Sequence, residues 1–557
     1  MSFIAKIDDA VHNSFVGRFF EFEKRNAKFS VECKGALATF MTMAYILAVN
    51  PRILSDSGGP CIPDPQEEGG IFGPNYNQCI EQIKREFITS TAIASCLSCC
   101  LMGILANLPV ALAPGMGMNA YFAYSVVGFR GTGNISYEAA VTAVAIEGAC
   151  FVVLSVSGLR YALIRWIPEP VRIATPAAIG AFLAHLGLQT AEGLGVVVSD
   201  VATAVTLGAC PPDKRTPIVA LTESCAADTT TCVISDAYTC DVLGGVMTSP
   251  TTWVGILGTV MILVLLAYRW NSAFIVSISF ITFISWFRNT SITYFPDTPA
   301  GNERFEYFKQ VVSVEGVSNV FAPFTSDLGQ VGVALFTFLY VDFLDTSGTL
   351  FGLVSNMGCI DENGDFPRSR MAYSCDGLGT LVGSFFGLSP ITSYIESAAG
   401  VGTGSRTGLT AVLCGFFFFL SIFFAPIIAS IPAWATGGAL VVVGSMMAKA
   451  LKDIKWHDPT HAATAFLTVI IMPLTYSIAY GLIAGIGTYL VLNTTFYLLT
   501  FLGIEKPVFT PEDIDQPISL EAQPKELEVT ENEEGAKKVE KESSDEEAPE
   551  KEVVEDA

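Results

Sequence analysis

Charged residues are scarce in this chain, and their scarcity excludes an ordinary soluble domain. Only 15% of the 557 residues are Asp, Glu, Lys or Arg, whereas 51% are hydrophobic and the mean hydropathy is +0.48. Soluble domains carry about 25% charged residues. The net charge of −23 is concentrated near the C-terminus, where residues 505–557 hold 19 acidic and 6 basic side chains. The composition therefore predicts a polytopic membrane protein with a disordered acidic tail.

Motifs of several other protein classes are also missing. The four histidines show no ligand spacing with cysteine or carboxylate, so we expect no metal site. No GxxxxGK[ST] loop is present, which argues against ATP-driven pumping and leaves coupling to an ion gradient. No nucleophile–base constellation stands out, and no signal peptide is visible. We therefore expect no enzyme, no cofactor and no nucleic-acid partner.

Apolar runs divide the chain into fourteen segments close to the length that crosses a bilayer, about 20 residues. The expected spans are 36–55, 87–107, 112–128, 137–157, 169–190, 252–269, 271–288, 333–357, 371–387, 389–403, 407–425, 432–449, 461–477 and 479–502. Basic residues near the span ends place both termini in the cytoplasm. We expect five regions: a cytoplasmic N-terminus (1–35), a first seven-span repeat (36–288), an extracellular connector (289–332), a second repeat (333–504) and the tail (505–557).

The N-terminal region carries an apolar stripe at every fourth position, formed by Phe3, Ile7, Val11, Phe15 and Phe19. This spacing predicts a short amphipathic helix. The helix either lies on the inner membrane surface or packs on the body of the protein.

The two longest outer loops, 58–86 and 191–251, contain an even number of cysteines. These are Cys61, Cys79, Cys210, Cys225, Cys232 and Cys240. An even number outside the cell predicts two or three disulfides, whose pairing the sequence does not reveal.

Two parts of the chain resemble each other. LAPGMGMNAYFA (112–123) is similar to LSPITSYIESAA (388–399), and ATPAAIGA (174–181) is similar to ATGGALVV (435–442). Seven spans per copy is an odd number, so the second copy must enter the membrane upside down. Inverted repeats that hold substrate between interrupted helices are a known transporter plan.

The two Leu-x-Pro segments are too short and broken to be whole spanning helices. Pro114 and Pro390 fit the first turn of a half-helix that begins inside the membrane, after extended residues. Gly115 and Gly117 would let a ligand approach the first half-helix, and Asn119 adds an amide that can donate and accept. The alternative is a plain Gly/Pro kink in which Asn119 bonds a neighbouring helix.

Three carboxylates lie inside segments that are otherwise apolar: Asp342, Asp345 and Glu396. An ionisable group at membrane depth costs roughly 2.5–3.5 kcal/mol even on the lenient insertion scales, so such groups usually have a function. Asp342 and Asp345 share one helical face. We expect one to accept N–H groups from a substrate and the other to exchange a proton. A structural pair that holds helices together is the alternative.

Two further ionisable side chains, Glu147 and His185, also fall inside predicted spans. Glu147 could take part in a proton relay. His185 follows a Gly/Ala-rich packing stretch and is typical of a hydrogen bond between helices.

Four stretches together resemble the azaguanine-resistance type (AzgA-like) purine permeases of the nucleobase–ascorbate transporter superfamily. They are FMTMAYILAVNP (40–51), ALAPGMGMNAYFAY (111–124), VDFLDTSGTL (341–350) and SPITSYIESAAGVGTGSRTGLTA (389–411). The resemblance covers roughly residues 15–504, and the long outer loop and acidic tail resemble those of fungal members.

This resemblance implies an all-α fold of fourteen spans in two inverted repeats, with a core domain, a gate domain and discontinuous spans 3 and 10. It implies a homodimer in the plasma membrane that takes up adenine, guanine and hypoxanthine with protons. Carried over by position, Asp342 and Glu396 would hold the purine, Asn119, Gly117 and Pro390 would complete the site, and Asp345 would serve proton coupling.

Rival functions are a carrier for another nucleobase or a small anion on the same fold, an intramembrane enzyme and a membrane receptor. An anion carrier predicts a basic residue where Glu396 stands. A receptor would bind a purine without concentrating it.

Overall fold

The structure is a computed structural model that describes most of the chain. The described residues are 3–63, 73–159, 167–189, 193–200, 204–207, 215–219, 234–240, 247–327, 329, 331–357 and 366–504. The predicted disordered tail and three of the outer-loop cysteines, Cys210, Cys225 and Cys232, lie outside these residues.

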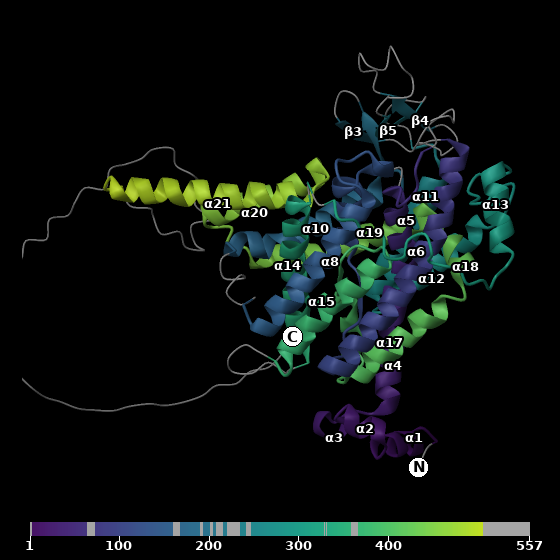
Figure 1. The fold of residues 1–557 in the computed structure, drawn as a ribbon, viewed down its shortest axis with the longest axis horizontal. Coiled ribbons are helices and arrows are strands. Elements are labelled where there is room, and N and C mark those ends of the chain that lie inside the picture. The colour runs from purple at the N-terminus through teal and green to yellow at the C-terminus, as the bar shows by residue number, and fades with distance from the viewer. Residues whose placement is uncertain are drawn as a thin grey trace, which may run out of the picture. The chain divides into compact units, whose positions relative to one another are not determined.

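Helices make up most of the described chain (Figure 1). The α-helices are α1 (Phe3–His12), α2 (Phe15–Phe19), α3 (Phe22–Arg25), α4 (Phe29–Met43), α5 (Ile46–Asp56), α6 (Pro74–Leu101), α7 (Met116–Ala120), α8 (Tyr137–Ser157), α10 (Glu169–Leu188), α11 (Pro250–Ala267), α12 (Ala273–Ser285), α13 (Pro299–Phe308), α14 (Gly332–Asn356), α15 (Ser369–Phe385), α16 (Ala398–Gly402), α17 (Gly408–Ser421), α18 (Ala425–Ala429), α19 (Ala433–Met447), α20 (Pro459–Thr475) and α21 (Ile478–Phe501). Other helical turns are η2 (Met102–Ala106), η3 (Tyr121–Val126), η4 (Phe129–Gly131), η8 (Ile395–Ser397) and η9 (Ala448–Asp453).

Three pairs of short antiparallel strands interrupt the helices, so the expectation of an all-α protein is wrong in detail. The strands are β1 (Leu112–Pro114), β2 (Val197–Asp200), β3 (Ala204–Leu207), β4 (Arg215–Val219), β5 (Ile234–Cys240) and β6 (Ile391–Ser393). β2 pairs with β3, β4 with β5, and β1 with β6. The first two pairs lie in the long loop, where Val, Ile and Thr favour strands. The third joins the two Leu-x-Pro segments.

Eight of the described helical stretches are long and apolar enough to cross a membrane. They are Phe29–Asp56, Asn75–Ala106, Tyr137–Ser157, Glu169–Leu188, Pro250–Ala267, Gly332–Val354, Ala433–Asp453 and Ile478–Phe501. Three shorter apolar helices accompany them: α12, α17 and α20. The protein is therefore an integral membrane protein, as its composition predicted.

The N-terminal stripe is divided between two helices, because α1 carries Phe3, Ile7 and Val11 and α2 carries Phe15 and Phe19. The chain breaks between α1 and α2 because the Ser14 hydroxyl caps a new helix, accepting from the N–H groups of Val16 at 3.2 Å and Gly17 at 3.4 Å. Phe15 remains 79% exposed, whereas Phe22 is buried against Leu409 and its neighbours. Part of this region thus packs on the protein, and part presents apolar side chains outward.

A buried carboxylate anchors the start of α17 to α4. Glu32 accepts from the backbone N–H of Arg406 at 2.9 Å and of Thr407 at 3.3 Å, and from the Thr410 hydroxyl at 2.7 Å. These donors include free N–H groups of a helix N-terminus, which a carboxylate satisfies. Figure 1 shows α17 running beside α4 and α6.

One disulfide, between Cys61 and Cys79, joins the two ends of the first long outer loop. This bond is one of the two or three disulfides that the outer-loop cysteines predicted, and the structure supplies its pairing, which the sequence left open. The other proposed bonds involve residues outside the described part of the chain.

Glycines allow α10 and α19 to pack closely. A Cβ atom on Gly180 would lie 2.6 Å from the carbonyl oxygen of Gly444, and one on Gly187 would lie 2.5 Å from that of Gly437. Small residues at such contacts let two helix backbones approach, which is how membrane helices gain packing energy.

Gly180→Ala is expected to lower thermal stability, because its Cβ would collide with the backbone of Gly444 rather than with a flexible side chain. Overpacking of this kind costs about 1–3 kcal/mol. The measurement is the unfolding midpoint of the purified protein in detergent. Gly487→Ala is the matched control, since its Cβ would meet nothing within 4 Å. Equal midpoints for the two variants would contradict this account of the helix contact.

Candidate functional site

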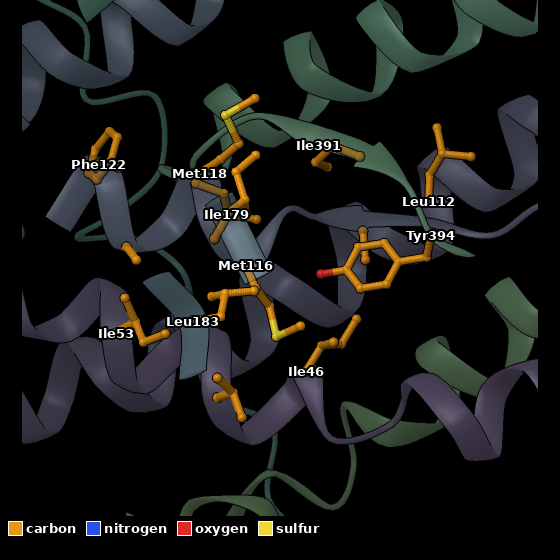
Figure 2. Packing of buried hydrophobic residues seen from close by; sticks show 14 of the residues in the cluster. Ile46, Ile53, Leu112, Met116, Met118, Phe122, Ile179, Leu183, Ile391 and Tyr394 are labelled. Atoms are coloured by element: carbon orange, nitrogen blue, oxygen red, sulfur yellow. The ribbon is translucent and has the colours of Figure 1, made fainter. Parts of the chain in front are cut away.

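The two Leu-x-Pro segments meet as a pair of antiparallel strands. Pro114 lies opposite Ile391, and Leu112 lies opposite Ser393. The ladder continues beyond the strands, because the Gly115 N–H donates to the Pro390 carbonyl at 3.0 Å. We call the pairing of Leu112–Pro114 with Ile391–Ser393 the strand crossing. Figure 2 shows it among buried apolar side chains, which include Met116, Ile391 and Tyr394. Segments about 280 residues apart in sequence thereby come together inside the helix bundle.

The prediction that Pro114 and Pro390 open half-helices is wrong. Pro114 ends strand β1, and α7 starts at Met116; Pro390 precedes strand β6, and helical turns resume only at Ile395. Proline has no N–H to donate, so it fits the end of a short strand at least as well as the first turn of a helix. The related expectation of extended residues before Pro114 is confirmed by Leu112 and Ala113.

Side chains supply the hydrogen bonds that the short strands leave unmade. The Pro114 carbonyl accepts from the Tyr394 hydroxyl at 2.6 Å and from the Asn50 amide at 2.9 Å. The Thr380 hydroxyl donates to the Ile391 carbonyl at 2.9 Å. Irregular backbone at membrane depth is tolerated only when the protein satisfies it in this way.

Glu396 and Asp345 form the more accessible group of carboxylates. Glu396 is 8% exposed and accepts from the Tyr45 hydroxyl at 2.9 Å. Asp345 on α14 is half-buried, accepts from Thr392 at 3.4 Å, and lies close enough to Glu396 for their charges to interact. One helical turn along the same face, a Cβ on Gly348 would meet nothing within 4 Å. The described residues therefore leave this position of α14 uncovered.

Asp342 belongs to a second, fully buried group. Its Oδ1 accepts from the Thr346 hydroxyl at 3.3 Å, and its Oδ2 has no hydrogen-bond donor among the described residues. The Thr346 hydroxyl lies 2.6 Å from the carboxylate of Asp376, which also accepts from Ser393 at 2.9 Å. Thr346 and Thr392 are 3.0 Å apart, so two hydroxyls connect the buried group to Asp345.

The sequence reasoning missed Asp376, although the signal was present. Asp376 is a carboxylate inside the predicted span 371–387, the same feature that singled out Asp342 and Glu396. It is fully buried on α15, and its hydrogen bonds reach both α14 and the segment that starts with β6.

Asn119 and Gly117 lie on α7, directly after the strand crossing. Asn119 is buried, and its side-chain oxygen accepts from the Ser389 hydroxyl, while its Nδ2 has no acceptor within the part of the chain that the structure describes. A Cβ on Gly117 would lie 2.6 Å from a methyl group of Ile179 on α10. Gly117 therefore allows a close approach of another helix, and any approach of a ligand stays a prediction.

The aromatic side chains near the crossing already pack on one another. Phe343 stacks on Phe151 with ring centroids 4.5 Å apart. Tyr45 stacks on Phe274 at 5.4 Å while its hydroxyl bonds Glu396. Of these aromatic residues, Tyr45 has its hydroxyl directly on a candidate site carboxylate.

A bundle of apolar helices that encloses carboxylates and two broken segments is the architecture of a membrane transport protein. The comparison with known families agrees with this class. Residues 69–221 and 254–484 match the Permease family (Xan_ur_permease), so the chain belongs to that family. The protein is accordingly a permease and not an enzyme.

Three relatives illustrate the breadth of this similarity. A Schizosaccharomyces pombe protein provisionally named a xanthine/uracil permease is 41% identical, covering 92% of this chain and 81% of its own. The efflux pump notK′ of Aspergillus versicolor is 42% identical over 88% and 84% of the two chains. The adenine permease AdeP of Escherichia coli is 32% identical over 86% and 90%.

Among solved structures, SLC26A9 is similar in fold, with a TM-score of 0.50 over 89% of this chain and 70% of that one. The two sequences are only 11% identical, so the likeness concerns the fold alone.

Tyr394→Phe is expected to destabilise the strand crossing, because it removes one of two donors to the buried Pro114 carbonyl. A single hydrogen bond of this kind contributes about 0.5–1.5 kcal/mol. Thermal unfolding in detergent measures the loss. Tyr497→Phe is the control, since that side chain is 74% exposed on α21. If both variants unfold at the wild-type temperature, the hydrogen bond to Pro114 does not support the crossing.

Proposed function

We propose that this permease is a proton-coupled symporter that takes up purine nucleobases, namely adenine, guanine and hypoxanthine, across the plasma membrane. The observation that carries the proposal is the convergence of Glu396, Asp345 and Asn119 at the strand crossing. The resemblance of the motifs to purine permeases and the similarity to an adenine permease support the same substrate class.

The chemistry of a purine suits these side chains. A purine is flat and uncharged, and its rim alternates N–H donors with ring-nitrogen acceptors. The carboxylates of Glu396 and Asp345 can accept from the N–H edge, and the unpartnered Nδ2 of Asn119 can donate to a ring nitrogen. Charge-assisted bonds in a dry site discriminate well, because an analogue that lacks one partner leaves a buried group unpaired.

We assign the two aspartates in the reverse of the order that the resemblance implies. Asp345 is half-buried, lies close enough to Glu396 for their charges to interact, and shares its helical face with Gly348, where an added Cβ would meet none of the described residues within 4 Å. Asp342 is fully buried behind Thr346 and Asp376. A substrate that enters from water would meet Asp345 first, so Asp345 binds the purine and Asp342 belongs to the coupling apparatus.

The packing of the helices supports the expected inverted repeat of fourteen spans. The eight long helices, the three shorter apolar ones, α15 and the two broken segments correspond in order to the fourteen predicted spans. α6 packs on α17 as α15 packs on α8, and α11 packs on α19 as α20 packs on α10. α6 and α15 are seven spans apart along the chain, and so are α8 and α17, α11 and α20, and α10 and α19. Such paired contacts are what a two-fold related pair of repeats produces.

The same contacts support a division into core and gate. α4, α6, α8, α14, α15 and α17 pack mainly on one another and on the strand crossing. α10, α11, α12, α19, α20 and α21 form a second set centred on the α10–α19 contact. Movement of one set against the other would expose the site alternately to the two sides. We expect the working unit to be a homodimer in the lipid bilayer, with both termini in the cytoplasm.

Glu396→Gln and Asp345→Asn are each expected to weaken adenine uptake roughly 10- to 100-fold, because each removes a charge-assisted hydrogen bond of about 1.5–3 kcal/mol. The measurement is initial uptake of radiolabelled adenine by cells that express equal amounts of each variant at the surface. Competition by a panel of purines, pyrimidines and small anions identifies the preferred substrate.

The matched controls are Glu306→Gln and Asp297→Asn, whose side chains are 69% and 85% exposed. They should transport like the wild type. Wild-type uptake by Glu396→Gln or Asp345→Asn would remove that residue from the site. If uptake is not inhibited by purines and is inhibited only by anions or by uracil, the proposed substrate class is wrong.

A further inference from the structure

Glu147 is a buried carboxylate that takes no part in the proposed substrate site. It lies in the middle of α8 with none of its surface exposed, and neither carboxyl oxygen has a hydrogen-bond donor among the described residues. An ionised carboxylate buried without a donor is strongly unfavourable. The protein must therefore neutralise this side chain in another way.

Two other carboxylates face Glu147. α8 packs on α14 and α15, and on these helices Asp342 and Asp376 lie close enough to interact with Glu147, the Asp342 carboxyl within hydrogen-bonding reach. Oδ2 of Asp342 also lacks a donor in the described part of the chain. Asp345, one turn further along α14, is the next titratable group that interacts with Asp342.

Glycines hold the acids at this short range. A Cβ on Gly148 would lie 3.0 Å from the carbonyl oxygen of Gly377, and one on Gly377 would lie 3.0 Å from that of Gly148. Glu147 and Asp376 are the residues immediately before these two glycines. The close contact of α8 and α15 thus places Glu147 and Asp376 at the same helix–helix interface.

No cation on the protein offsets this charge in the described residues. None of the ion pairs there includes Glu147, Asp342 or Asp376, and no group of side chains there could hold a metal ion. A hydrogen bond between two carboxyl groups requires a proton on one of them. The proton is then the ligand that compensates this charge.

We propose that Glu147 and Asp342 form the site of the transported proton, which they share in one carboxyl–carboxylate hydrogen bond. The inference rests on the proposed function and deepens it, since it locates the coupling ion behind the purine. Binding converts two facing carboxylates into one carboxylic acid and one carboxylate, and release returns the proton to water. The pair is a coupling site, whereas Glu396 and Asp345 bind the substrate.

A chain of hydroxyls connects the two sites. Asp342 accepts from Thr346 at 3.3 Å, Thr346 lies 3.0 Å from Thr392, and Thr392 donates to Asp345 at 3.4 Å. When the proton is lost, Asp342 and Asp376 compete for the hydrogen bond that the Thr346 hydroxyl donates. The change at Thr346 alters the hydrogen bond that Thr392 donates to Asp345. Purine binding and proton binding are coupled through these two side chains.

Glu147→Gln tests the proposal, because glutamine preserves the shape, is permanently neutral and can donate to Asp342. The purified full-length variant is reconstituted into liposomes. We expect exchange of labelled for unlabelled adenine to stay near the wild-type rate. Under an inward gradient of about one pH unit, which can drive about tenfold accumulation at one proton per purine, the wild type should concentrate adenine. The variant should only equilibrate it.

Two further variants sharpen the comparison. Glu138→Gln lies on the same helix, in its first turn, and should accumulate adenine like the wild type. Glu147→Asp keeps a carboxyl group and should recover at least part of the accumulation. Wild-type accumulation by Glu147→Gln would overturn the proposal.

A measurement on the wild type covers the case in which Glu147→Gln does not fold. Infrared difference spectra recorded on changing the pH should show a buried carboxylic acid that titrates within the range in which transport occurs. Absence of such a signal would also overturn the proposal. Failure of the proposed function looks different, since the wild type would then transport no nucleobase while the infrared signal remained.

Discussion

Backbone N–H and C=O groups inside an apolar helix bundle have no water to bind, and this requirement governs the centre of the protein. Where two spans lose their helical hydrogen bonds, the backbones of Leu112–Pro114 and Ile391–Ser393 pair with each other. Tyr394 and Asn50 donate hydrogen bonds to the Pro114 carbonyl. This crossing fixes the start of each following helical turn, and so it fixes the positions of Asn119 and Glu396.

The same apolar surroundings explain the two groups of carboxylates. An acid at this depth is retained only if a donor, a proton or a substrate compensates its charge. Glu396 has the Tyr45 hydroxyl, and Asp376 has the hydroxyls of Thr346 and Ser393. Among the described residues, Glu147 and one oxygen of Asp342 have no donor. In the proposed mechanism Glu396 binds a substrate with N–H groups, whereas Glu147 and Asp342 are compensated by a shared proton.

Sequence reasoning located the candidate site better than it described the local backbone. The cost of a charge in the membrane was enough to select Asp342, Asp345 and Glu396, and applied consistently it would have selected Asp376. The prolines were misread, because a missing N–H is equally compatible with a strand end and with the first turn of a helix. Only the partner strand, about 280 residues away, distinguishes the two.

By itself the sequence determined that the chain lies in a membrane, which segments are apolar enough to cross it, and which side chains are too polar to be there without a reason. These properties depend on composition and on local spacing. The tertiary structure alone decided that Asp345 lies near Glu396, that Asp342 lies near Glu147 and Asp376, and that Gly148 and Gly377 bring α8 and α15 together. Such contacts join helices far apart in the chain, and the pairing of residues across helices depends on packing that no local pattern encodes.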